Sequence, residues 1–311
     1  METVVAAVLP ERKFTFLKRA AEILVQIYIN QDAYLPFFEL LGKYENAQDE
    51  KIKLFVLYAL ELLAEFSFDE ELLIKHSEKF TIWFEKFMAD ESVGVRVGAT
   101  TSLSSFLSCI QETSHIMKFE GVLPQLLTLL IEAIKEDEEK GLKVIKSFED
   151  LINSHPKFVK KQLEEILNVF SEILIAQNLS EGIRNASIEC LATAATRNPV
   201  PCRKSKTFSE KTIAALMNVM LEQPDDLNEW LDQYEENSLE KNSVSANAVE
   251  CLPRFAEGLG VKFLLPKIIA YAFQFINNDD WRYKYAGLMG LGMLVEGSSA
   301  HFDKDFDNLM K

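Results

Sequence analysis

The chain has 311 residues and a formal net charge of −15, with 33 Lys and Arg against 48 Asp and Glu. This excess of acid disfavours nucleic acid and anionic membranes as partners and makes basic proteins the complementary ones. Hydrophobic residues make up 48% of the chain while Gly and Pro number only 12 and 9, which favours long helices with a large buried surface.

The scattered cysteines and the lack of a recognisable signal peptide favour a reduced, intracellular location. The four cysteines are widely scattered, and no histidine flanks them at metal-ligand spacing, so we expect neither a metal nor another cofactor. The apolar run from Val4 to Leu9 is too short for the core of a signal peptide. Every longer apolar run is broken by charges, so no membrane span is expected.

An internal repeat is the main signal in the sequence. An acid, an apolar–basic pair and a helix rich in Ala, Ser and Gly recur along the chain. The first four basic positions are 43, 47 and 41 residues apart, within the range of about 40–47 residues expected of HEAT and armadillo units. The pairs are Ile52–Lys53, Val95–Arg96, Leu142–Lys143, Ile183–Arg184 and Tyr283–Lys284, and the acids are Asp49, Asp90, Asp137, Glu181 and Asp280.

Each repeated helix is expected to have an upstream partner helix, often entered through a proline. Two partners are predicted by apolar spacing at 163–175 and 211–221, and three by Pro36, Pro124 and Pro266. Small residues on the second helices, Ala99, Ala192, Ala195, Ala286 and Gly290, would allow close packing. The expected fold is all-α, a right-handed α-solenoid of about six to seven HEAT repeats built from antiparallel helix pairs and continuous over residues 1–311.

The acid-to-base element has a structural interpretation. An acid at a helix start accepts hydrogen bonds from free backbone N–H groups, and a base one turn later can reach an acid of the adjoining repeat. We also expect Leu288 and Leu291 to lie in the shared core.

The last interval, from Arg184 to Lys284, is 100 residues, which is two units with an excess of roughly 20. A helix over 245–259 supplies the missing repeat, and Pro253 within it should kink or shorten it.

The excess is an acidic insertion over residues 222–243, placed between the two helices of one repeat. Eight acids and no base lie between Glu222 and Glu240. Leu227, Trp230, Leu231 and Tyr234 follow helical spacing, which predicts a short amphipathic helix after Pro224. One interpretation is a solvated loop that docks Trp230 for stability. The other is a surface that recognises a basic partner through clustered acids.

The stretch from Asn277 to Gly297, with Asp280-Trp-Arg-Tyr-Lys-Tyr-Ala-Gly-Leu-Met, closely resembles a repeat helix of the karyopherin-β nuclear import receptors, particularly the importin-five (importin beta-3) subgroup. The resemblance extends back through 258–266 and the acidic insertion, and less specifically through 147–163; upstream of Phe119 it rests on repeat spacing and general pattern.

This resemblance implies a binding protein that moves between cytoplasm and nucleus through nuclear pores. Its implied partners are the small GTPase Ran in its GTP form, basic cargo proteins and FG-repeat nucleoporins, and we expect a monomer. In that family the acidic loop contributes to Ran contacts. The positions of this chain that take the loop's role are Asp225, Asp226, Glu229, Trp230, Asp232, Glu235 and Glu236.

Two further expectations concern the limits of the chain and its alternatives. Receptors of the family are much longer, so we expect a part of a larger receptor, beginning near a third repeat and ending in the first helix of another unit. A HEAT scaffold that assembles a phosphatase-type complex would share the acidic, helical composition and is the alternative. An enzyme is not expected, because no phosphate-binding loop, nucleophile elbow or helical His pair is present in the sequence.

Overall fold

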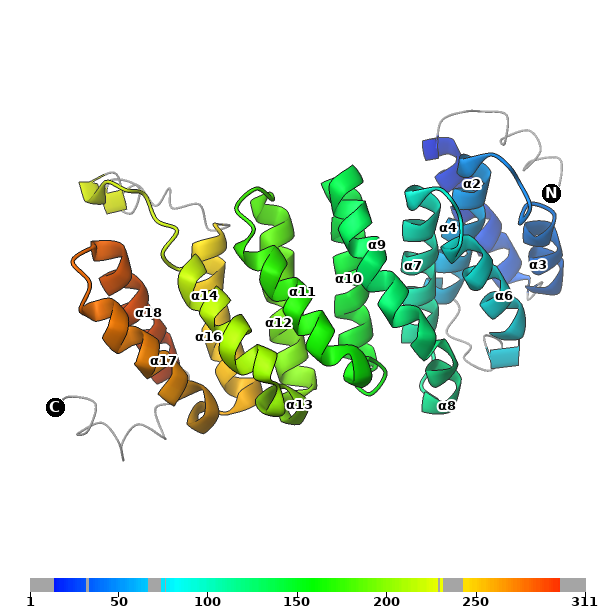
Figure 1. Ribbon diagram of the computed structural model, residues 1–311. Coiled ribbons are helices and arrows are strands. Elements are labelled where there is room, and N and C mark those ends of the chain that lie inside the picture. The colour runs from blue at the N-terminus through cyan, green and yellow to red at the C-terminus, as the bar shows by residue number, and fades with distance from the viewer. Residues whose placement is uncertain are drawn as a thin grey trace. The chain divides into compact units, whose positions relative to one another are not determined.

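The computed structural model describes residues 14–31, 34–66, 74–75, 77–228, 230–231 and 243–296. All regular structure within these residues is helical, as predicted (Figure 1). The chain divides into two compact units, residues 1–158 and 159–311, and each is described by itself.

The first unit consists of two rows of helices. The helices of one row lie side by side in chain order, α2 against α4, α4 against α7 and α7 against α10. The helices of the other row pack on them, with α3 on α2, α6 on α7, and α9 on both α7 and α10. The bounds are α2 Phe14–Asn30, α3 Tyr34–Gly42, α4 Glu50–Phe66, α6 Ser77–Met88, α7 Val93–Ser108, α8 Thr113–Ile116, the 3-10 helix η1 Met117–Val122, α9 Leu123–Glu136 and α10 Glu138–Ser154.

The second unit repeats this arrangement. α12, α16 and α18 form one row, with α16 between the other two, while α11 packs on α12, α14 on α16 and α17 on α18. The bounds are the 3-10 helix η2 Val159–Gln162, α11 Leu163–Ile175, α12 Glu181–Arg197, α13 Pro199–Lys204, the π-helical turn η3 Phe208–Thr212, α14 Ile213–Val219, α16 Val244–Leu259, α17 Val261–Ile276 and α18 Trp281–Glu296. The helix predicted to supply the missing repeat is therefore present as α16.

Aromatic side chains form much of the core of the first unit. Phe80 contacts Phe38 of α3 at 5.3 Å between ring centroids and Phe106 of α7 at 4.9 Å, and Phe106 contacts Phe119 at 6.1 Å. All four rings are at most 4% exposed. Because each buried aromatic ring removes a large apolar area from water, this chain of contacts joins successive helix pairs into one core.

The predicted small residues allow close helix packing. Ala99, Ala192, Ala195 and Ala286 are fully buried. A Cβ added at Gly290 would lie 3.3 Å from Met217 Cε and 3.4 Å from Ile268 Cγ2, so this glycine packs against side chains of α14 and α17. These positions let neighbouring helices approach closely, as ridge-into-groove packing requires.

Some acids of the repeated element accept hydrogen bonds at helix starts, as predicted. Asp49 and Asp137 accept from the backbone N–H of Lys51 at 2.8 Å and of Glu139 at 3.0 Å. In α7 the N-cap is Ser92, which accepts from Val95 N–H. Such caps supply hydrogen-bond acceptors that a helix start otherwise lacks.

Two bases of the repeated element in the first unit also reach acids of the next helix pair. Lys53 pairs with Asp90 at 2.5 Å, and Arg96 pairs with Glu132 on α9 at 2.7 Å. Burial alone would raise the pKa of Asp90, but hydrogen bonds from Lys53 Nζ and from Ser92 N–H hold that pKa below its usual value. The predicted polar ladder is confirmed at these positions.

α16 runs on through Pro253 to Leu259, so this proline does not shorten the helix. Two expectations about proline and helix faces are wrong. α17 begins at Val261, so Pro266 lies inside the helix and does not open it. Leu288 is 61% exposed and Leu291 is half-buried, whereas the buried positions of α18 are Ala286, Gly287, Gly290 and Leu294.

Three further features of the described residues concern the cysteines, metal sites and membrane spans. All four cysteines lie within it and are free thiols. No group of three or more His, Cys, Asp or Glu side chains in the described residues could hold a metal ion. Within the same residues, none of the helices has the length and apolar character needed to span a bilayer.

Candidate functional site

The candidate site is the start of the acidic insertion, where the chain leaves α14 in the second unit. The structure describes residues 222–228, 230 and 231 of the insertion, together with 243 at its end. Asp225, Asp226 and Trp230 of the predicted site lie in this part. Glu229, Asp232, Glu235 and Glu236 lie outside the described residues, as does Tyr234 of the predicted apolar face.

The first acid of the insertion is tied to a buried arginine. Arg184 on α12 is 5% exposed, and its Nη2 contacts both carboxylate oxygens of Glu222, at 2.6 and 2.7 Å. Its Nε donates to the carbonyl of Leu174 at 2.8 Å. Because a buried guanidinium without a partner is strongly destabilising, Glu222 serves the fold.

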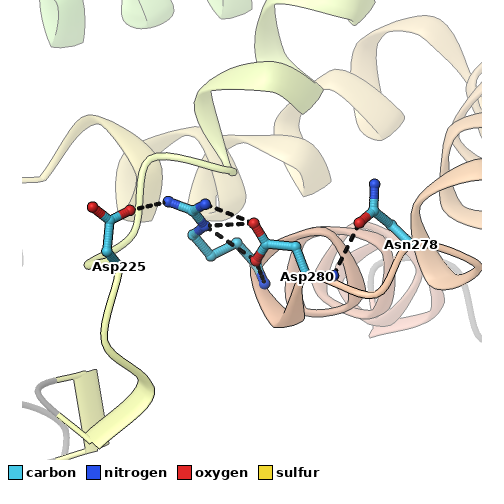
Figure 2. A network of polar contacts seen from close by, with 4 residues as sticks. Asp225, Asn278 and Asp280 are labelled. Atoms are coloured by element: carbon cyan, nitrogen blue, oxygen red, sulfur yellow. Dashed lines mark hydrogen bonds and ion pairs between the residues drawn. The ribbon is translucent and has the colours of Figure 1, made fainter.

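A second arginine holds the next acid (Figure 2). Arg282, in the first turn of α18, contacts Asp280 through Nε at 3.0 and 3.1 Å and through Nη2 at 2.6 Å. Its Nη1 donates to Asp225, whose side chain is 95% exposed. Asp280 also accepts from the backbone N–H of Arg282, and these hydrogen bonds lower the pKa of Asp280. The basic partner at this repeat is thus Arg282, whereas the sequence pattern predicted Lys284.

The predicted helix after Pro224 is present as a short turn. Asp226 Oδ1 accepts from Asn228 N–H at 2.9 Å, and the backbone carbonyl of Asp226 accepts from Trp230 N–H at 3.1 Å. Leu227 and Leu231 remain 42% and 41% exposed. The apolar spacing therefore identified the helical turn, but of these side chains Trp230 is the one with described ring contacts to the fold.

Trp230 docks on the start of α18. Its ring centroid lies 5.4 Å from that of Trp281 and 5.3 Å from that of Tyr285, in tilted and edge-on geometries. Trp281 and Tyr285 are themselves 6.4 Å apart. Such aromatic contacts contribute about 0.5–1.5 kcal/mol each beyond the area they bury. Docking of Trp230, expected of the solvated-loop interpretation, is compatible with recognition because Asp225 stays exposed.

The sequence analysis did not predict the pairing of Arg184 with Glu222 or the role of Arg282. Arg184 was identified as a ladder base, but its partner Glu222 was counted among the acids of the insertion. Arg282 had a local signal, since Asp280 stands two residues before it, yet the repeat pattern favoured Lys284. Two arginines and an aromatic cluster therefore fix the start of the acidic insertion to the fold. The rest of the acidic insertion follows this start in the sequence.

The fold and the site together define a class of protein: an array of stacked helix pairs with an acidic insertion. Two family models match consecutive parts of the chain, one described as "IPO5-like, TPR repeats" over residues 20–169 and one described as "Importin repeat" over residues 176–266. The chain belongs to the importin-β family. The first match includes the region upstream of Phe119, and the second ends before the Trp281 stretch that carried the resemblance.

Individual relatives agree with this assignment. The probable importin-5 homolog of Dictyostelium discoideum is 26% identical over 265 residues, which is 84% of this chain and 24% of that protein. Importin subunit beta-3 of Saccharomyces cerevisiae is 23% identical over 218 residues, which is 69% of this chain and 20% of that protein. The chain thus spans about a quarter or less of the length of these relatives.

A solved structure shares the fold. The crystal structure of Kap121p bound to Pho4p matches with a TM-score of 0.76 and 19% identity, covering 88% of this chain and 27% of Kap121p. The predicted all-α array of HEAT-type helix pairs is confirmed by this likeness.

Proposed function

We propose that this chain provides binding surfaces of a nuclear transport receptor, and that its acidic insertion contacts a basic protein partner. Family membership supports the receptor function and favours it over the alternative of a phosphatase-type scaffold. Family membership also supports the proposal that the chain binds partners and has no enzymatic activity. The main observation in support of this site is that the Asp225 side chain is held by Arg282 and is yet 95% exposed.

The geometry of the insertion supports recognition of a basic surface. Arg184 and the Trp281 cluster hold the start of the insertion on α12 and α18. A partner would therefore bind a surface that is already ordered. Ordering before binding reduces the entropy lost on association. The eight acids between Glu222 and Glu240 would steer a basic partner towards this point.

The contacts of Arg282 also indicate which side chains of a partner could bind at the start of the insertion. Its guanidinium lies between the carboxylates of Asp225 and Asp280 (Figure 2), and planar guanidinium groups match carboxylates well. A Lys or Arg side chain of a partner would therefore find at Asp225 an exposed carboxylate of the type that already binds a base within the chain.

The partners implied by the family are Ran in its GTP form, basic cargo and nucleoporins, and the protein would act in the cytoplasm and the nucleus, including the nuclear pore. Kap121p has been crystallised with Pho4p and with Nup53p, which illustrates partner binding by a protein of the same fold. The receptor function predicts selective capture of Ran by its bound nucleotide.

The test is a pull-down in which the immobilised chain is offered Ran loaded with GTP or with GDP at equal concentration. Retention of the GTP form alone is the expected result. Equal retention of both forms, or of neither, would contradict the receptor function. Substitution of Trp230 by Ala, which removes the aromatic anchor, should weaken the retained complex.

A further inference from the structure

The second unit has two edges of opposite charge. The segments that precede α12, α16 and α18, residues 176–181, 220–228 and 277–282, contain six acids and one base. The other edge, where α12 and α16 end, consists of residues 159–165, 197–210 and 257–263, and we call it the basic edge. We propose that the basic edge binds an acidic, extended segment of a partner protein. This site goes beyond the proposed function of the insertion, because it lies on the opposite edge and selects the opposite charge.

The basic edge has a surplus of positive charge in an otherwise acidic chain. It contains seven bases and four acids, whereas the whole chain has a net charge of −15. All seven bases are exposed: Lys160, Lys161, Arg197, Arg203, Lys204, Lys206 and Lys262. The four acids are Glu164, Glu165, Glu210 and Glu257. Lys206 pairs with Glu210 at 3.8 Å, but both side chains are well exposed, so this pair is weak and can be exchanged for a partner's carboxylate.

Contacts of α13 bring the three stretches of the basic edge together. Arg203 Nη1 donates to the carbonyl of Leu259, the last residue of α16, at 3.1 Å. α13 also packs on α12 and η3. Burial is the main cause of the raised pKa of Cys202, and the nearby carboxylate of Glu164 raises this pKa further, so α13 also lies near the first turn of α11. Figure 1 shows α13 at the end of the unit opposite the loop that leaves α14.

Part of this positive charge serves the fold. Arg197 is in the last turn of α12, and Arg203 and Lys204 are in the last turn of α13. Positive charge is favourable there, because the carbonyl end of a helix dipole is negative. The contact of Arg203 with the carbonyl of Leu259 has the same role at the end of α16.

The helix dipole does not account for Lys160 and Lys206, which lie near helix starts. Ser205 Oγ accepts from Phe208 N–H at 2.9 Å, so Lys206 directly follows the residue that caps the helical run into α14. Lys160 lies in η2, three residues before α11 begins at Leu163. Positive charge near the N-terminus of a helix is unfavourable. These two lysines therefore support a role of the basic edge in binding.

The acidic edge is too distant to cancel the charge of the basic edge. α12 runs from one edge to the other, and its 17 residues span about 25 Å at 1.5 Å per residue. The Debye length at physiological ionic strength is about 8 Å. A partner at the basic edge is therefore largely screened from the acids at the other end of α12.

The side chains of the basic edge favour an acidic protein segment over a nucleic acid. Proteins that bind single-stranded nucleic acid combine basic side chains with aromatic rings on which bases stack. The two rings of the basic edge, Phe208 and Phe263, are buried and half-buried. Val200 on α13 is 49% exposed and can contact an aliphatic side chain of a partner. Because the bases come from three stretches, an extended segment with several carboxylates can contact more of them than a single side chain can.

The probe is a fluorescent 12-residue peptide of Asp and Glu with a central Leu. A control peptide has Asn and Gln in place of the acids, and an oligothymidylate of the same net charge represents nucleic acid. Fluorescence anisotropy with the whole chain at physiological salt should show tighter binding of the acidic peptide than of either control.

Two variants of equal net charge show where the acidic peptide binds. The edge variant carries Lys160→Gln, Lys204→Gln and Lys206→Gln, and the matched variant carries Lys75→Gln, Lys86→Gln and Lys135→Gln at exposed positions of the first unit. The edge variant should bind the acidic peptide roughly threefold to thirtyfold more weakly than the wild type, as expected for the loss of three exposed ion pairs. The matched variant should bind it nearly as tightly as the wild type.

Equal affinity of the edge variant and the matched variant for the acidic peptide would overturn the proposal. Binding of the amide peptide as tight as that of the acidic peptide would do so too, and tighter binding of the oligothymidylate would assign the edge to nucleic acid instead. Circular dichroism of each variant shows whether the helical fold is kept. These outcomes are independent of the Ran pull-down, since the edge variant leaves the acidic insertion intact.

Discussion

Replacement of Gly258 by Ala tests a close contact between α12 and α16, two neighbouring helices of one row in the second unit. A Cβ at this position would lie 2.6 Å from the carbonyl oxygen of Ala195 and 2.8 Å from both Ala195 C and Thr196 Cα. Real Cβ atoms essentially never come closer than 3.0 Å, so α12 and α16 would have to separate by at least 0.4 Å. The atoms that must move belong to backbone and cannot rotate away.

The expected cost follows from two opposing terms. Overpacking of a close contact costs about 1–3 kcal/mol. Removal of a helical glycine recovers up to about 1 kcal/mol, and less at the end of a helix such as α16. The free energy of unfolding should therefore fall by about 1–2 kcal/mol. Gly292→Ala is the matched control, because its added Cβ meets nothing within 4 Å in the described residues and should instead stabilise α18 by up to about 1 kcal/mol.

Urea denaturation measures both variants, and amide hydrogen exchange locates the effect. Gly258→Ala should speed exchange in α12 and α16 while α4 and α7 exchange at the wild-type rate. Close packing of α16 on α12 at Gly258 would be contradicted if Gly258→Ala were as stable as the wild type or as Gly292→Ala.

The remaining predictions concern burial, pH and thiol chemistry. Leu294→Ala should lower the free energy of unfolding by about 2–5 kcal/mol and Leu288→Ala by under about 0.5 kcal/mol, as measured in urea; equal losses would contradict the assignment of the buried face of α18. Because the pKa of Asp90 is lowered in the folded chain, its stabilising effect is present above its unfolded pKa and is lost as pH falls through its folded pKa. Asp90→Asn should therefore be less stable than the wild type at pH 7, and the difference should narrow below about pH 4; a constant difference would count against the ion pair with Lys53. Burial raises the pKa of Cys202 to about 12, so Cys202→Ser should leave the rate of thiol labelling of the native protein unchanged at pH 8, and a slower rate would show that Cys202 is reactive.

The sequence predicted the parts of the fold that depend on periodicity. The spacing of basic residues located the helix pairs, and the apolar pattern from Leu163 to Ile175 reproduced α11 to the residue. Small residues on the second helices indicated close packing, because small side chains let neighbouring helices approach each other. These features are local or strictly repeated, so a single chain displays them.

Features that depend on tertiary contacts were not predictable in the same way. The stretch around Leu288 is apolar on every side, so its pattern does not define which face is buried. Pro266 resembles a helix start in sequence, but packing of α17 on α18 holds a longer helix around it. The pairing of Glu222 with Arg184 joins residues 38 positions apart, and the basic edge of the second unit is formed by three stretches that are not adjacent in the sequence.

Contact between the acidic insertion and a basic partner is tested by the affinity of a fluorescent Lys- and Arg-rich peptide at low and high salt. The test variant converts the acids of the predicted site to amides, and a matched variant converts six exposed acids elsewhere. The test set is Asp225→Asn, Asp226→Asn, Glu229→Gln, Asp232→Asn, Glu235→Gln and Glu236→Gln, and the matched set is Glu39→Gln, Glu78→Gln, Glu85→Gln, Glu91→Gln, Glu165→Gln and Glu257→Gln.

Both variants carry the same net charge, so a difference between them reports the location of the contact and not the overall field. We expect the test variant to bind the peptide more weakly than the matched variant at low salt, and the difference to shrink at high salt, where screening is stronger. Equal affinity of the two variants at low salt would contradict recognition of a basic partner by the acidic insertion.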